Sequence, residues 1–150
     1  MNSGKLSIVK NTVTWTIIAL VIVGILIIAY YEVRGRMPAR VSNARIEIET
    51  SVIFSIEEIE SAIDMVIRDF ADNRDSWNEL LEVLYSERHS NALVKRRNWE
   101  AGSAIVLIAN YQRNSALGSN RPSTMTRWEW ALIRDGPDGS WRIVASGKAL

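Results

Sequence analysis

Residues 11–31 read NTVTWTIIALVIVGILIIAYY, and the rest of the chain is organised around this stretch. It contains no charged residue and is flanked by Lys10 and Glu32. At about 1.5 Å of rise per residue, a helix of this length just crosses the ~30 Å hydrocarbon core of a bilayer. Its aliphatic side chains favour insertion by about 5 kcal/mol before the polar residues are counted. The stretch therefore predicts a single transmembrane helix.

Aromatic residues stand at both ends of this stretch. Trp15, Tyr30 and Tyr31 are placed as anchors at the membrane interface, which makes membrane lipid the first predicted partner. A cleaved signal peptide is the main alternative, but no small-x-small cleavage site follows the apolar run directly. The nearest candidate, residues 42–44, lies too far downstream. We therefore expect an uncleaved anchor, and a protein of the cell membrane with one crossing.

The charges around the stretch leave its orientation open. Two lysines precede it and four arginines follow within 15 residues, at positions 34, 36, 40 and 45. A positive-inside count would place the carboxyl-terminal part in the cytoplasm, but the count is a weaker guide for long translocated domains.

The roughly 120 residues after the stretch are enough for one domain with a real core. The net charge is only +1, so we expect no nucleic-acid partner. No cysteine is present, which excludes disulfides, thiolate metal sites and thiol catalysis. We expect no cofactor. The predicted organisation is a polar cytoplasmic stub over 1–10, a transmembrane helix over 11–31, a juxtamembrane linker over 32–45 and a domain over 46–150.

The strongest local signal in that domain is a helix start. Ser55 and Glu58 fit a capping box, in which each side chain binds the backbone amide of the other residue. Phe54 and Ile59 are spaced as a hydrophobic staple around it. Apolar residues then recur at helical spacing, which predicts an amphipathic helix over 56–71.

Strands are expected after this helix. Residues 77–85 are densely apolar and fit either a helix or a strand. Residues 86–97 are polar and basic, which predicts an exposed loop. Residues 104–111 predict a buried strand. Residues 114–124 predict a long loop, and a short extended segment is expected over 46–54. Alternation over 125–134 and 141–147, with a turn at 135–139, predicts an antiparallel hairpin. One helix and an antiparallel sheet define an α+β fold.

The order of these patterns resembles a family of uncharacterised domains in membrane-anchored or secreted proteins of Gram-positive bacteria. The resemblance covers about 52–147 and rests on the Trp-x-Trp-x-Leu-x-Arg core at 128–134 and the Gly-x-Trp-x-Ile at 139–143. It implies a nuclear-transport-factor-two-like, or cystatin-like, fold: a cone of helix and curved antiparallel sheet. It also implies that 80–85 is a strand and that the domain is extracytoplasmic. The chain departs from the family in lacking a cysteine before residue 80 and in having a helix as its anchor.

The resemblance also suggests a site. In a cone, Trp128, Trp130, Trp141 and Tyr85 can line an apolar ligand pocket, although such residues more often form core. The only histidine, His89, lies in the stretch expected to be an exposed loop.

Two charged residues of the last hairpin are expected to interact. We expect Arg134 and Glu129 to form a surface pair across strands, which would contribute little to stability.

Three functions remain open from the sequence. The first is a tethered, non-catalytic binding or interaction module for a small apolar ligand or an envelope protein. The second is a structural subunit of an envelope assembly. The third is an enzyme of the isomerase or dehydratase kind, with Asp64 or Asp69 as base. The first is preferred because no assembled set of catalytic residues is evident.

Overall fold

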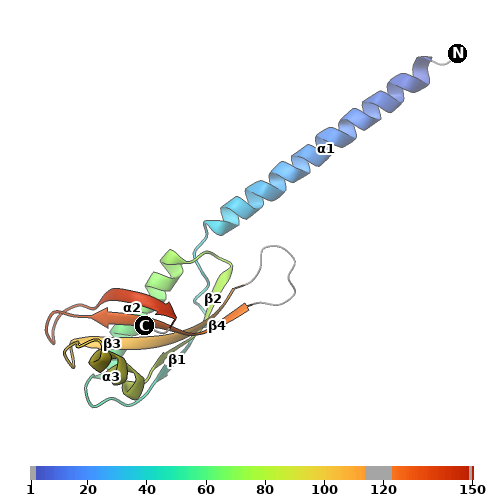
Figure 1. The fold of residues 1–150 in the computed structure, drawn as a ribbon. Helices are drawn as coiled ribbons and strands as arrows, with labels where there is room; N and C mark the ends of the chain where they lie inside the picture. Colours follow the sequence, from blue (N-terminus) through green and yellow to red (C-terminus); the bar gives the residue numbers. More distant parts are fainter. Residues whose placement is uncertain (1–2, 114–122, 149) are drawn as a thin grey trace. The chain divides into compact units, whose positions relative to one another are not determined.

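The computed structural model describes residues 3–113, 123–148 and 150, with the backbone alone for 3–14 and 35 (Figure 1). The chain divides into two compact units, Met1–Arg36 and Met37–Leu150. Three helices and one five-stranded sheet occur in the described residues, so the fold class is α+β, as the sequence predicts.

The first unit is a single helix, α1 (Ser3–Gly35). It extends past the predicted span at both ends and includes part of the expected stub and part of the expected linker. The first proline is Pro38, so no proline interrupts the helix before Gly35. The segment Trp15–Arg34 has a mean hydropathy of 2.4, and none of the window is buried. By length and composition, this helix can cross a membrane.

The second unit is built on one sheet with the strand order β1-β2-β3-β4-β5. Its strands are β1 (Arg45–Ile48), β2 (Asn78–Tyr85), β3 (Ala104–Arg113), β4 (Ser123–Ile133) and β5 (Arg142–Lys148). Strand β1 pairs parallel to β2, and every other neighbouring pair is antiparallel. The predicted strands at 80–85 and 104–111 and the final hairpin are therefore confirmed. Most of the predicted loop over 114–124 lies outside the described residues.

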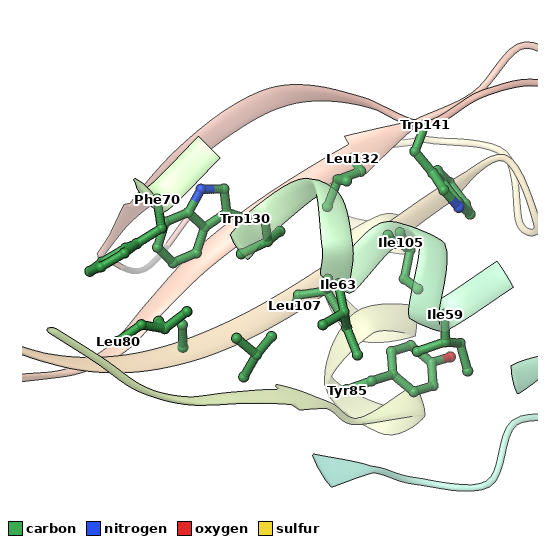
Figure 2. Close-up of a cluster of buried hydrophobic side chains, with 14 of the residues drawn as sticks. Ile59, Ile63, Phe70, Leu80, Tyr85, Ile105, Leu107, Trp130, Leu132 and Trp141 are labelled. Carbon is green, nitrogen blue, oxygen red and sulfur yellow. The ribbon is translucent and has the colours of Figure 1, made fainter. Parts of the chain in front are cut away.

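Helix α2 (Ile56–Asn73) covers one face of the sheet. Its predicted capping box is confirmed: the Glu58 amide donates to Ser55 Oγ at 3.2 Å, and the Ser55 amide donates to Glu58 Oε2 at 2.6 Å. Such a cap contributes about 1 kcal/mol. The apolar stripe of α2 packs on inward-facing residues of β2, β3 and β4 (Figure 2). Its buried members are Ile59, Ala62, Ile63, Val66 and Phe70.

Helix α3 (Glu87–Arg96) supplies residues to a second, smaller core cluster. The exposed loop predicted for 86–97 is therefore wrong. Ser90, Leu93 and Val94 are spaced to share one face of α3 and are buried, and Ser90 Oγ accepts the Val106 amide of β3 at 3.0 Å. Alternate residues of a strand point to opposite faces, so this cluster lies on the sheet face opposite α2. Its members are Leu93, Val94, Ala104, Val106 and Ala131.

The folded unit starts earlier in the chain than position 46. Ala39 is buried, and its amide donates to the carbonyl of Ala71 at 3.2 Å. The amide of Arg40 donates to Asn78 O at 3.0 Å, and Leu80 donates to Arg40 O at 2.9 Å. Residues 38–40 are therefore not a linker, because their backbone groups pair with α2, with Asp75 and with the start of β2.

Candidate ligand-binding site

The four aromatic residues predicted for a pocket all lie in the core beneath α2. Tyr85, Trp130 and Trp141 are buried, and Trp128 is partly buried against the same cluster (Figure 2). Trp141 Nε1 donates to the carbonyl of Glu58 at 3.0 Å, and burial raises the pKa of the Tyr85 phenol. None of the four lines either cavity described below. The structure brings these residues together as packing, and a ligand pocket between them stays a prediction.

Trp128 is the least satisfied member of this group. Its Nε1 is buried and has no hydrogen-bond partner among the described residues. The Arg74 guanidinium lies 4.9 Å from its ring centre and 5.3 Å from that of Tyr111. Such cation–π contacts contribute about 0.5–2 kcal/mol each, so Arg74 fastens the end of α2 to the sheet.

The two aspartates considered as a catalytic base have other surroundings. Asp64 is exposed on α2. Asp69 accepts a hydrogen bond from Trp130 Nε1 at 2.9 Å and another from Asn73 Nδ2 at 2.8 Å. Each carboxylate oxygen of Asp69 thus holds a structural contact.

Glu129 and Arg134 do not pair with each other, so that prediction is wrong. They are five positions apart, and an odd separation along a strand turns side chains to opposite faces. Arg134 instead reaches Glu58 on the α2 side, with Nη1 2.6 Å from Oε1. Both Arg134 and Glu129 are buried, not on the surface as expected.

His89 and Glu129 form a pair beside α3. Their Nε2 and Oε1 atoms are 2.9 Å apart, and the other Glu129 oxygen accepts the Leu150 amide at 2.7 Å. The Glu129 side chain is 6% exposed and that of His89 is 24% exposed. The Nδ1 atom of His89 has no partner among the described residues.

This pair borders a cavity of about 340 Å3. The lining comes from α3 and β4 and consists of His89, Ala92, Leu93, Arg96, Arg127 and Glu129. Among the described residues, neither Arg96 nor Arg127 forms an ion pair. The lining therefore carries two uncompensated guanidinium groups, since the one acidic side chain in it is bound to His89 and Leu150.

The backbone of Arg127 is unusual. Its φ is 57°, a value that few residues other than glycine adopt. It lies where the β3–β4 register shifts between Ala109 and Tyr111, and its amide donates to Asn110 Oδ1 at 2.9 Å. A bulge of this kind redirects the side chain of the extra residue.

A second cavity, of about 290 Å3, lies beside Glu58 and Arg134. In this cavity, Glu58 and Arg134 form an ion pair with each other. Arg134 Nε donates to Gly102 O at 3.0 Å, and the Phe54 and Trp141 ring centres lie 5.6 and 4.6 Å from its guanidinium carbon. The backbone amide of Ser55 and the Arg134 guanidinium both lower the pKa of Glu58. This cavity therefore has no free cation in its lining, and the cavity beside α3 is the better candidate site.

Within the described residues, no group of three or more histidine and acidic side chains is arranged to hold a metal ion. Comparisons of the chain with protein-family models, with curated proteins and with solved structures found no match.

The residues of this site are not evident from the sequence because they are far apart along the chain. His89 and Glu129 are 40 positions apart and follow no local motif. One signal did point to it: residues 104–109 are apolar without alternation, which is typical of a strand covered on both faces. A second covering element was therefore required, and the acidic first turn and basic last turn of 87–96 suit a helix.

Proposed function

We propose that the chain is a single-pass membrane protein that holds a non-catalytic binding module outside the cytoplasm. The observation that carries the proposal is that α1 is apolar and uncovered while the second unit has a core of its own. All large apolar residues from Trp15 to Val33 except Tyr31 are 41–69% exposed, which is unfavourable in water and favourable in lipid.

Contacts at the end of α1 support the interface assignment. The Arg34 guanidinium donates to the Tyr30 hydroxyl at 2.5 Å, and Arg36 pairs with Glu32 at 3.1 Å. Aromatic and basic residues gathered at one end of an apolar helix are typical of the headgroup region. Trp15 occupies the corresponding place at the other end of the candidate span.

The module is proposed to be a cystatin-like cone. A helix with a buried apolar stripe against a largely antiparallel sheet supports this assignment. An extracytoplasmic position follows from the family resemblance, against the arginine count. A binding role is favoured because one polar cavity has two cationic groups without ion-pair partners among the described residues, whereas the arginine of the other cavity is paired with Glu58.

Membrane integration is tested by alkaline carbonate extraction of cells that produce the full chain. The wild-type protein should stay in the pellet at its intact mass of 17.0 kDa. Two arginines, in Ile22→Arg/Leu26→Arg, add about 5–7 kcal/mol to the insertion cost and should release the protein. The matched control Ile22→Leu/Leu26→Ile should stay in the pellet. A shortened product without α1 would identify the stretch as a cleaved signal and contradict the anchor.

Orientation is tested with a single introduced cysteine, since the chain has none of its own. Ser61 is exposed on α2, so Ser61→Cys should react with a membrane-impermeant maleimide on intact cells. Ser7→Cys, before the apolar stretch, should react only after lysis. The reverse pattern would place the module in the cytoplasm.

A further inference from the structure

We propose that the cavity between α3 and β4 binds a phosphate group, with Arg96 and Arg127 as its ligands. This inference names the ligand class of the proposed binding module and so rests on that function. The defining residues are the two arginines and the His89–Glu129 pair, all of which line the same cavity.

The charge of the lining favours an anion. Arg96 and Arg127 outnumber the single carboxylate of Glu129, and both oxygens of that carboxylate are already hydrogen-bonded. Guanidinium groups form charge-assisted, often bidentate bonds with phosphate oxygens. Two guanidinium groups can each bind different oxygens of one ligand, which matches the three terminal oxygens of a phosphate monoester better than the two oxygens of a carboxylate.

The positions of these groups are built into the fold. Glu129 is buried and holds the His89 ring in the cavity lining through Nε2. The Arg127 backbone is held at positive φ by the Asn110 side chain. Backbone conformations of this kind are unfavourable and cluster at ligand sites.

The apolar part of the lining is small. Leu93 and Ala92 of α3 complete the cavity, whose volume of about 340 Å3 is near the lower end for small-molecule sites. A phosphate monoester with a short organic group suits this volume. Two sources of such a group exist, a free ester and a lipid headgroup, and the experiment separates them.

The experiment uses the full chain in phosphatidylcholine nanodiscs and measures glycerol phosphate binding by equilibrium dialysis at about 0.15 M salt, where distant surface charges are screened. Saturable binding is expected. Arg96→Gln and Arg127→Gln should each weaken the affinity about tenfold, the loss typical of one charge-assisted contact.

Arg88→Gln and Arg97→Gln are the matched controls. Both arginines are exposed and near or on α3, and neither lines the cavity. Each control variant loses the same charge and should change the affinity less than twofold. If all four variants weakened the affinity for glycerol phosphate equally, the effect would come from the overall charge of the protein, and the proposal would be overturned. An absence of saturable binding would also overturn it.

The two sources are distinguished by competition. In nanodiscs that also contain phosphatidic acid, a raised apparent Kd for glycerol phosphate in the wild type means that lipid headgroups reach the cavity. An unchanged Kd means that a free phosphate ester is the ligand. Both results support a phosphate site. Carbonate extraction tests membrane integration through α1 without depending on ligand binding. A failed membrane anchor and a failed phosphate site would therefore give different experimental results.

Discussion

The two faces of the sheet differ in how they bury charge. On the α2 face, Arg134 and Glu58 are joined at 2.6 Å, and the aromatic rings of Phe54 and Trp141 flank the guanidinium. On the α3 face, His89 and Glu129 are joined at 2.9 Å beside a cavity with two arginines that form no ion pair within the described part of the chain. The first pair fastens a helix start to the sheet, whereas the second leaves cations available to a ligand.

The two faces also differ in the size of their buried apolar clusters. The α2 face is filled by large aromatic and aliphatic side chains, several of them fully buried (Figure 2). The α3 face buries a smaller cluster of mostly small residues. The difference indicates that the α2 face supplies most of the stability, because hydrophobic stabilisation scales with buried apolar area.

The largest expected effect is therefore on the α2 face. Trp130→Ala removes a side chain that is 1% exposed together with its hydrogen bond to Asp69. We expect a loss of about 3–5 kcal/mol in the free energy of unfolding, measured by urea denaturation. Trp130→Phe should lose less, since it leaves a ring in place. A loss below about 1 kcal/mol for Trp130→Ala would contradict the assignment of this face as the main core.

Leu93→Ala makes the matching change on the α3 face. Leu93 is 4% exposed, but it borders a cavity and belongs to the smaller cluster. We expect a loss of about 2 kcal/mol, at the lower end for buried leucines, because part of its surroundings is already empty. Ala92→Ser, at an exposed position on the same helix, is the control and should change stability little. A loss for Leu93→Ala as large as that for Trp130→Ala would remove the distinction between the faces.

The sequence predicted the α2 face well and the α3 face poorly, for a physical reason. The elements of the first have strong local signals: a capping box at Ser55, a regular apolar stripe, and alternation through Trp128 and Trp130. Helix α3 has only ten residues, few of them apolar, so its polar composition hid a helix stabilised by tertiary contacts. The candidate site depends on pairs such as His89 and Glu129 that only the folded chain brings together.

Glu58→Gln tests the ion pair between Glu58 and Arg134 on the α2 face. At pH 7 we expect a loss of about 1.5 kcal/mol, because the buried Arg134 keeps a neutral acceptor in place of a charged one. The folded-state pKa of Glu58 lies below its ordinary value of 4.5, so its contribution is complete above that value and is lost as the pH falls through the lowered pKa. The difference between wild type and variant should therefore narrow from pH 7 to pH 3.

Unfolding curves in urea at several pH values measure this difference. Glu60→Gln is the control, since Glu60 is exposed on the same helix and forms no ion pair among the described residues. A difference that stays constant with pH would show that Glu58 acts through its shape and not through its charge.

The smallest effect is expected at an apolar residue that lies on neither face. Val52 is 91% exposed, and its amide donates to Glu87 Oε2 at 2.8 Å, which links its loop to the start of α3. Val52→Ser keeps that backbone bond, so stability should change by less than about 0.5 kcal/mol in the same urea assay. Glu87→Ala removes the bond instead and should cost more, about 1 kcal/mol. The opposite order would mean that the Val52 side chain is buried in the intact protein. In that case, apolar side chains outside the two faces of the sheet would also contribute to stability.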